Sequence, residues 1–213
     1  MTKWLGNQAS ERLHTIHNGA RIYPMVCRPC LNGRKARLVS IGSLTEKKNF
    51  STAIKAVGRV RDQIEKYVII GRGEEHNKLA AIIAEEELLD VVELVGWQAD
   101  PSPWLCASDI QLIPSRWEGF GLVAVEGMST GLPVIASDVD GLREVVASSG
   151  RGCLFIQDPL SAEAWSNGIT TMIDRVRADK GDEIPRLAHE NASRFSLDVM
   201  CRSYAQTYKR VAA

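Results

Sequence analysis

The chain has 213 residues, of which 45% are hydrophobic, and its 26 basic side chains equal its 26 acidic ones in number. A net charge of zero argues against a nucleic-acid-binding protein, because such proteins normally carry a basic excess. The length is enough to bury one sizeable core. Apolar runs fall far short of the about 20 residues of a membrane span, and the first residues lack the apolar stretch of a signal peptide. A cytoplasmic protein is therefore expected.

Short apolar runs alternate with segments of helical periodicity along most of the chain. The apolar runs predict strands at residues 38–42, 67–70, 91–95, 109–113, 133–136 and 153–156. Between the first two runs, residues 49–60 place apolar side chains on one face of a helix. Alternation of this kind favours an α/β, Rossmann-like fold, in which a parallel sheet is covered by helices on both faces.

The end of the chain is predicted to be helical from Pro159 onward. The apolar stripe of its last helix consists of Leu197, Met200, Tyr204, Tyr208 and Val211. Such a stripe is typical of a helix that packs one face against another surface.

Five cysteines are spread along the chain, and two of them have the spacing of a redox motif, Cys27-Arg-Pro-Cys30. No strand is predicted before this pair, and no second pair completes a zinc site. A connecting segment with incidental thiols is the preferred interpretation, and a redox or metal role is the alternative. Cys106 and Cys153 lie in apolar contexts and are expected to be buried thiols.

Two glutamates, Glu118 and Glu126, bracket a Gly-Phe-Gly-Leu turn between a predicted strand and a predicted helix that Gly131 and Pro133 end. A glycine-containing turn at a helix start leaves backbone N–H groups unpaired, and together with the helix dipole they suit a phosphate. Glu126 lies about one turn into the helix, where an ionised carboxylate can accept hydrogen bonds from two neighbouring sugar hydroxyls. A phosphate cradle beside a diol acceptor predicts a nucleotide-sugar site.

This pattern is followed by Gly-Leu-Pro-Val-Ile-Ala-Ser at residues 131–137 and resembles the donor-binding half of retaining glycosyltransferases of the GT-B class. It is most similar to family 4, the glycosyl transferases group 1. Residues 40–49, 69–73 and 92–97 resemble further segments of that family in the same order. The resemblance covers roughly residues 34–213. It implies the C-terminal, donor-binding domain of an enzyme that needs no metal ion or other cofactor.

The resemblance implies roles for the residues around the turn. It places Glu126 on the ribose hydroxyls and Glu118, as a catalytic residue, on hydroxyls of the transferred sugar. An exposed helix glutamate and a surface turn residue are the respective alternatives. Backbone groups of Phe120, Gly121 and Leu122 are expected to face the diphosphate and the sugar, although the Phe120 ring can also pack in the core.

Further diphosphate contacts are expected after the first strand, at Gly42, Ser43 and Lys48. Lys48 matches the family's lysine and is the second catalytic residue, because a cation stabilises the charge that builds on the leaving phosphate; a solvated lysine is the alternative. Ser43 stands where the family commonly has arginine, so one bidentate phosphate contact is absent. Donor affinity is expected to be weaker by about ten- to a hundredfold, unless Lys47, Arg72 or another cation substitutes.

Two further turns are expected near the nucleotide. Gly71-Arg72-Gly73 follows a predicted strand but lacks the third glycine of a dinucleotide fingerprint, which argues against a Rossmann dehydrogenase. It is interpreted as a tight strand-to-helix turn. Gly96 and Trp97 fall where the family contacts the base, and Trp97 either stacks on the base or packs in the core.

Asp138-Val-Asp140 resembles the Asp-x-Asp metal motif of the other glycosyltransferase architecture. It follows the fifth predicted strand, however, where family 4 usually has a Gly-Gly pair and then a glutamate, a pattern that Gly141 and Glu144 fit. No metal is therefore expected. In the alternative, a bound Mg²⁺ would supply the charge compensation that Ser43 lacks.

A complete enzyme of the resembled family has an acceptor domain followed by a donor domain, and this chain has room for one of them. Residues 1–33 are interpreted as a connector or remnant of a missing N-terminal acceptor domain, in which His17-Asn18-Gly19 resembles the segment before the donor domain. Residues 34–194 are the predicted nucleotide-sugar-binding domain, and residues 195–213 a C-terminal amphipathic helix.

The sequence therefore predicts the donor-binding half of a glycosyltransferase in polysaccharide biosynthesis. Such an enzyme moves a sugar from a nucleoside diphosphate to a glycan, lipid-linked or small-molecule acceptor with retention. The acceptor half is expected on a separate chain or in a part of the protein that this sequence lacks, and any membrane contact only through it. A catalytically inactive nucleotide-sugar-binding module or truncated remnant is the alternative.

Overall fold

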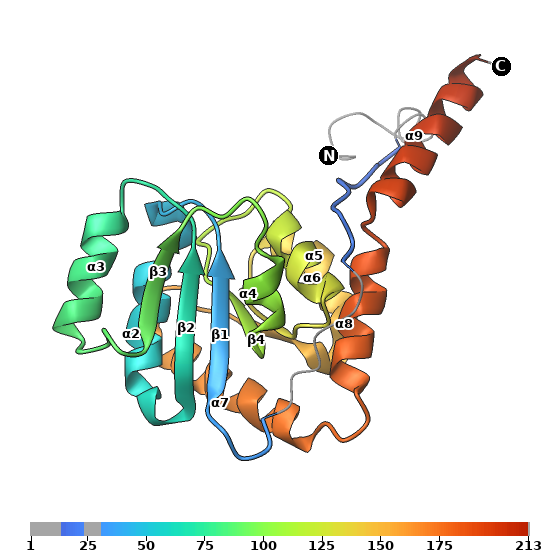
Figure 1. Cartoon of the computed structure of the whole chain (residues 1–213). Coiled ribbons are helices and arrows are strands. Elements are labelled where there is room, and N and C mark those ends of the chain that lie inside the picture. The colour runs from blue at the N-terminus through green and yellow to red at the C-terminus, as the bar shows by residue number, and fades with distance from the viewer. Residues whose placement is uncertain (1–13, 24–30, 213) are drawn as a thin grey trace.

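The computed structural model describes residues 14–23 and 31–212, and its centre is a parallel sheet of six strands (Figure 1). The strands are β1 (Ala36–Ile41), β2 (Ile64–Ile70), β3 (Val92–Gly96), β4 (Ile110–Ile113), β5 (Val134–Ser137) and β6 (Cys153–Ile156). Their order in the sheet is β3-β2-β1-β4-β5-β6, and every neighbouring pair is parallel. All six predicted strands are confirmed, with bounds that differ by a few residues.

Helices connect the strands and follow the last one (Figure 1). They are α2 (Phe50–Arg59), α3 (His76–Glu85), α4 (Ser102–Cys106), α5 (Leu122–Ser129), α6 (Asp140–Val146), α7 (Ala162–Ala178), α8 (Glu183–Ser193) and α9 (Leu197–Ala212). Short 3₁₀ segments lie at Glu46–Lys48, Arg61–Gln63 and Ala147–Gly152. Helix α2 occupies the predicted segment 49–60, and α7, α8 and α9 form the predicted helical C-terminus. The α/β, Rossmann-like fold is confirmed.

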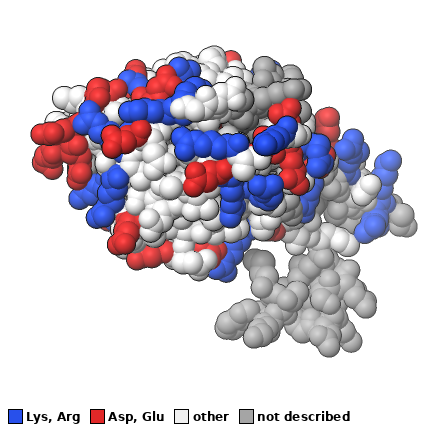
Figure 2. All heavy atoms as spheres, turned by 90° about the horizontal axis from the view of Figure 1, so that it is seen from below, with Lys and Arg blue, Asp and Glu red and all other residues white. Residues whose placement is uncertain are grey.

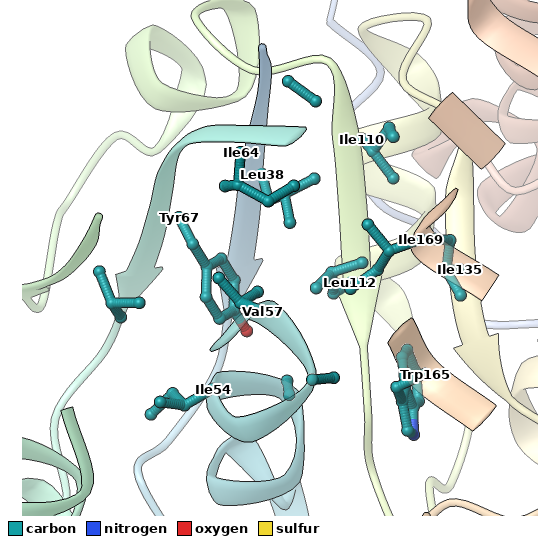
Figure 3. Packing of buried hydrophobic residues seen from close by; sticks show 14 of the residues in the cluster. Leu38, Ile54, Val57, Ile64, Tyr67, Ile110, Leu112, Ile135, Trp165 and Ile169 are labelled. Atoms are coloured by element: carbon teal, nitrogen blue, oxygen red, sulfur yellow. The ribbon is translucent and has the colours of Figure 1, made fainter. Parts of the chain in front are cut away.

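Helices cover both faces of the sheet because successive residues of a strand point to opposite sides. On one face, Leu38, Tyr67 and Leu112 pack in a core with α2, α3 and α7 (Figure 3). On the other face, Val39 of β1 packs in a cluster with α4, and Ala136 of β5 packs in a cluster with α5, α6 and α8. The strands therefore read as nearly continuous apolar runs, as strands buried on both faces do.

At the start of β1 and β4, an ion pair between a buried carboxylate and a partly exposed arginine connects two segments of the chain. Asp109, which is 2% exposed, accepts two hydrogen bonds from the Arg34 guanidinium, at 2.8 and 2.6 Å. It accepts a third from the backbone N–H of Arg37 at 2.8 Å. The pair ties the segment before β1 to the start of β4.

Basic and acidic side chains are interspersed over the underside of the molecule (Figure 2).

Helix α9 extends away from the sheet (Figure 1). Its predicted apolar stripe is largely exposed, with an exposed fraction of 45% for Tyr204, 70% for Tyr208 and 82% for Val211. The start of the helix is held by a β-bridge between Ala20 and Ser196. Of the helices in the described part of the chain, none is long and apolar enough to cross a membrane.

The cysteine predictions have mixed outcomes. Cys153 is buried, as predicted, and burial raises the pKa of its thiol to about 12. The prediction for Cys106 is wrong, because its side chain is exposed. Helix α4 turns Leu105 toward the sheet, and the next residue lies about 100° further around the helix. Cys27 and Cys30 lie outside the described residues.

Candidate functional site

The sheet reverses its winding between β1 and β4. From β1 the chain proceeds through β2 to β3 on one side, and from β4 through β5 to β6 on the other. Ligands of open parallel sheets bind at the carboxyl ends of the strands where the winding reverses. Gly42 and Ser43 follow β1 and Glu118 follows β4, so predicted site residues from both halves of the sheet meet there.

A cavity of about 380 Å³ lies at this reversal, and we call it the Glu118 cavity. Most of the predicted site residues line it. The lining residues are Asn18, Ile41, Gly42, Ser43, Lys48, Glu118, Phe120, Gly121, Leu122 and Val123. The fold therefore brings together segments that lie far apart in the sequence.

Lys48 and Glu118 form an ion pair in this cavity. Lys48 Nζ lies 2.5 Å from Glu118 Oε2, and the two side chains are only 14% and 12% exposed. The lysine stem runs over Gly42, where an added Cβ would lie 3.2 Å from Lys48 Cε. Burial of this kind rules out both the solvated-lysine and the surface-turn alternatives. The pair places one mobile cation and one acceptor carboxylate side by side.

A second set of contacts joins the loops that follow β1 and β4. The backbone N–H of Arg116 donates to the Lys47 carbonyl at 2.8 Å, and the Arg116 guanidinium bonds Glu46 at 2.5 Å. Lys47 Nζ lies 3.6 Å from the centre of the exposed Trp117 ring, a cation–π geometry. These contacts hold the Lys48–Glu118 pair at a fixed place between the two halves of the sheet.

Helix α5 begins at the wall of the Glu118 cavity. Its N-cap, Gly121, has φ 87°, in the left-handed region that favours glycine, and a Cβ there would lie 2.6 Å from Leu142 Cδ2. No side chain caps the start of this helix. The backbone N–H groups of Leu122 and Val123, which both line the cavity, are therefore available to an anion.

Glu126 lies one turn further along α5 and is not among the residues that line the cavity. Its side chain is half-buried, which rules out the exposed-glutamate alternative, and burial raises the pKa of its carboxyl above the usual value. The hydroxyl pKa of Tyr23 is raised by burial and then by the charges of Glu126 and Asp100, so these groups are neighbours. Within residues 14–23 and 31–212, no group donates a hydrogen bond to the Glu126 carboxylate, so it is an acceptor without a donor.

A second cavity, of about 390 Å³, adjoins the first, and we call it the Trp97 cavity. The lining residues are Ile41, Gly42, Ser43, Ile70, Gly71, Arg72, Trp97, Gln98 and Pro101. Ile41, Gly42 and Ser43 line both cavities, so the two form one continuous crevice along the ends of the strands. The Trp97 ring is 62% exposed, which rules out the core alternative, and the Arg72 guanidinium lies 5.8 Å from the ring centre.

Two glycine turns meet under the Trp97 cavity. Gly71 has φ +153°, and a Cβ on it would lie 1.8 Å from the Gly42 carbonyl oxygen. A Cβ on Gly73 would lie 2.3 Å from the Leu44 carbonyl oxygen, and the Leu44 N–H donates to the Arg72 carbonyl at 3.0 Å. The predicted tight turn after β2 is thus packed directly against the loop after β1. Gly96 ends β3 with φ +74°, and its carbonyl accepts from the Gly71 N–H at 2.9 Å.

The segment of residues 14–23 closes one side of the Glu118 cavity. His17 Nε2 lies 2.6 Å from Glu144 Oε1, and the His17 ring stacks on Phe120 at 5.9 Å between centroids. Phe120 also packs edge-on against Phe195 at 5.6 Å. The Phe120 ring therefore packs with His17 and Phe195 at the edge of the cavity that this residue also lines.

Asp138 is engaged within the protein, in hydrogen bonds from Arg143 and Gln157. The residues that the structure describes contain no group of three or more His, Cys, Asp and Glu side chains that could hold a metal ion. Asp138 stabilises the turn after β5 through these two contacts.

Sequence reasoning assigned no site role to six of the lining residues, which are Asn18, Ile41, Ile70, Gln98, Pro101 and Val123. Asn18 belongs to the His-Asn-Gly segment that was matched to the family, so its pattern could have identified it. Gln98 and Pro101 lie in an irregular loop after β3, where periodicity carries no signal.

The chain is similar in sequence to glycosyltransferases. It is 29% identical over 189 residues to the amylovoran biosynthesis glycosyltransferase AmsK of Erwinia amylovora, which covers 83% of this chain and 45% of that protein. It is 32% identical over 142 residues to the lipopolysaccharide core biosynthesis mannosyltransferase LpsB of Rhizobium meliloti, covering 62% of this chain and 38% of that protein. The chain thus spans less than half the length of these relatives.

A similar solved structure is that of HepE from Anabaena in complex with UDP and glucose. The TM-score is 0.73 at 25% identity, over 82% of this chain and 48% of that one. The family described as Glycosyl transferases group 1 matches residues 29–181, which is more than half of the chain and includes nearly every residue of both cavities. The chain belongs to the glycosyl transferases group 1 family.

Proposed function

We propose that this chain is the C-terminal, donor-binding domain of a retaining GT-B glycosyltransferase of family 4. The domain boundaries are those expected from the sequence: a connector at residues 1–33, the donor domain at 34–194 and the amphipathic helix at 195–213. The acceptor half lies on a separate chain or in a part of the protein outside this sequence. A cytoplasmic location belongs to the same proposal.

The observation that carries the proposal is the convergence of Lys48, Glu118 and the uncapped start of α5 on one cavity at the sheet reversal. A lysine and free N–H groups suit a phosphate, and a carboxylate suits sugar hydroxyls. Solved HepE, which is similar to this chain, was crystallised with UDP and glucose. The donor proposed here is therefore a nucleoside diphosphate hexose.

In the proposed reaction, the acceptor hydroxyl oxygen replaces the diphosphate oxygen on the anomeric carbon, and the hydroxyl proton passes to the leaving diphosphate. As the bond between the anomeric carbon and the diphosphate oxygen breaks, negative charge develops on that oxygen. Lys48 Nζ and the first N–H groups of α5 stabilise this charge. Glu118 accepts hydrogen bonds from hydroxyls of the transferred sugar, and Glu126 from the ribose hydroxyls. No metal ion takes part. The acceptor is a glycan, lipid-linked or small-molecule hydroxyl in polysaccharide or lipopolysaccharide biosynthesis, the settings named for AmsK and LpsB.

A catalytically inactive binding module is the second candidate. It is favoured by Ser43, which lines both cavities with a single hydroxyl where the resembled family commonly has arginine. Hydrolysis or transfer of a nucleotide sugar by the chain would exclude this candidate, whereas saturable binding without turnover of any donor would support it.

Calorimetric titration with UDP, GDP and ADP tests the proposal. We expect saturable binding of one nucleotide that is lost in Glu126→Ala and retained in Glu85→Ala. Glu85 is a matched control, because it is an exposed helix glutamate at the end of α3 that lines neither cavity. If the unmodified chain binds no nucleotide at concentrations up to millimolar, its binding free energy is weaker than about −4 kcal/mol. That result would refute a donor site.

A further inference from the structure

The cations that contact Glu118 do not balance the charge of the proposed donor. Of the two lysines near Glu118, at 3.9 and 2.5 Å, Lys48 lines the Glu118 cavity and Lys47 does not, so the pair that faces the donor carries no net charge. The diphosphate of a nucleotide sugar carries one negative charge on each of its two phosphates. A further cation in the crevice would offset part of that charge.

Lys47 is badly placed to contact the donor. It does not line the Glu118 cavity or the Trp97 cavity. Its ammonium group lies 3.6 Å from the centre of the Trp117 ring and is also near Glu118. Leaving these contacts would cost part of the cation–π energy, which is about 0.5–1 kcal/mol at an exposed site.

Arg72, in contrast, lines the Trp97 cavity together with Gly42 and Ser43. Its guanidinium lies 5.8 Å from the centre of the Trp97 ring. Within residues 14–23 and 31–212, no carboxylate lies within ion-pair distance of it, and the Trp97 ring is its aromatic neighbour, farther away than Trp117 is from Lys47. An exposed guanidinium without a carboxylate partner can bind a phosphate through two parallel hydrogen bonds without first breaking an ion pair.

The backbone of Arg72 is held in place relative to Ser43. The glycines on either side of it pack against the loop after β1, at distances that admit no Cβ. The Arg72 carbonyl accepts from Leu44 N–H at 3.0 Å, directly after Ser43. The Arg72 guanidinium therefore reaches the crevice from the β2–α3 turn. It lies next to the loop after β1, where Ser43 offers a single hydroxyl.

We propose that Arg72 is a donor-binding residue, which supplies from the β2–α3 turn the guanidinium contact to the donor diphosphate that Ser43 does not make. The inference rests on the proposed function, because it assigns a contact within the same donor site. It also implies that Arg72 reads the phosphate and not the base.

The test compares a nucleoside diphosphate with its own nucleoside. UDP, GDP and ADP are titrated first, and the tightest binder is then paired with uridine, guanosine or adenosine accordingly. In Arg72→Ala we expect binding of the diphosphate to weaken by about 10- to 150-fold, with the nucleoside unchanged. Arg72→Lys keeps the charge but loses the paired hydrogen bonds, so we expect an intermediate loss. Arg59→Ala, which removes an exposed arginine at the end of α2, is the matched control and should bind as the unmodified chain does.

The double variant Ser43→Arg/Arg72→Ala supplies the guanidinium from the other loop. We expect it to recover most of the diphosphate affinity that Arg72→Ala loses. If Arg72→Ala weakens nucleoside binding as much as diphosphate binding, Arg72 contacts the base. If Arg72→Ala binds the diphosphate as well as the unmodified chain does, Arg72 has no role in donor binding. Either result overturns the inference but does not refute the donor site. Failure of the unmodified chain to bind any nucleotide would overturn both. Thermal unfolding of each variant checks that the fold is kept.

Discussion

Replacing Glu126 by glutamine should make this protein more stable and a poorer nucleotide binder. Burial raises the pKa of the Glu126 carboxyl, and no group in the described residues donates a hydrogen bond to it. Its ionised form is therefore less favourable in the folded chain than in the unfolded chain. Glutamine has nearly the same shape and no charge, so Glu126→Gln removes this cost.

The sign of the pH dependence follows from proton binding. Because the pKa of Glu126 is higher in the folded chain, the folded chain binds more protons than the unfolded chain between the two pKa values. The free energy of unfolding therefore falls as pH rises through that window. The advantage of Glu126→Gln should be full at neutral pH and should vanish below about pH 4, where the glutamate is protonated in both states.

The expected loss of nucleotide affinity follows from removing the charged carboxylate of Glu126, which accepts hydrogen bonds in the proposed site. A hydrogen bond to a charged group contributes about 1.5–3 kcal/mol, so nucleotide affinity should fall about 10- to 150-fold in Glu126→Gln. In the unmodified chain, affinity should also fall as pH drops into the titration window of Glu126. Urea unfolding at several pH values measures the stability, and calorimetry measures the affinity. A variant that binds as well as the unmodified chain, or that is less stable at neutral pH, would refute this account of Glu126.

Three other substitutions test the crevice and its support. Gly71→Ala should lower the unfolding temperature strongly, because the new Cβ would lie 1.8 Å from the Gly42 carbonyl oxygen; near-normal melting would contradict the packing of the two turns. Asp109→Ala should lower the free energy of unfolding by about 1–3 kcal/mol, since it removes the buried acceptor of three hydrogen bonds from Arg34 and the Arg37 N–H; a loss in urea unfolding below about 0.5 kcal/mol would show that these bonds contribute little to stability. Lys48→Met should slow donor turnover, in the assembled enzyme, by about 100- to 1,000-fold and should also lower the unfolding temperature, because the largely buried Glu118 carboxylate loses its nearest cation; unchanged turnover would remove Lys48 from the reaction.

The strands were predictable because each one is a local apolar run that ends in a glycine, proline or polar residue. The same holds for the start of α5, where Gly121 precedes an apolar helix. Cys106 was mispredicted because its apolar neighbours in a short helix belong to one face and it belongs to another.

Side-chain pairing in the candidate site was not predictable in the same way. The contact between Lys48 and Glu118 joins residues 70 positions apart, and nothing local in either segment specifies it. The exposure of Trp97 depends on which loops surround the end of β3, so the sequence did not decide between a buried and an exposed ring. The functional roles of these residues stay predictions, since the structure gives their places and not their ligands.

The strand order has a consequence for how the protein folds. Leu38 in β1 pairs with Tyr67 in β2, which is near in sequence, and with Ile110 in β4, which is far away. Contacts between distant residues form late, because closing a long loop costs chain entropy before any contact is gained. The half built from β1, β2 and β3 should therefore form first, and docking of β4 should limit the refolding rate. The crevice spans that junction, so it is the last part of the domain to be completed.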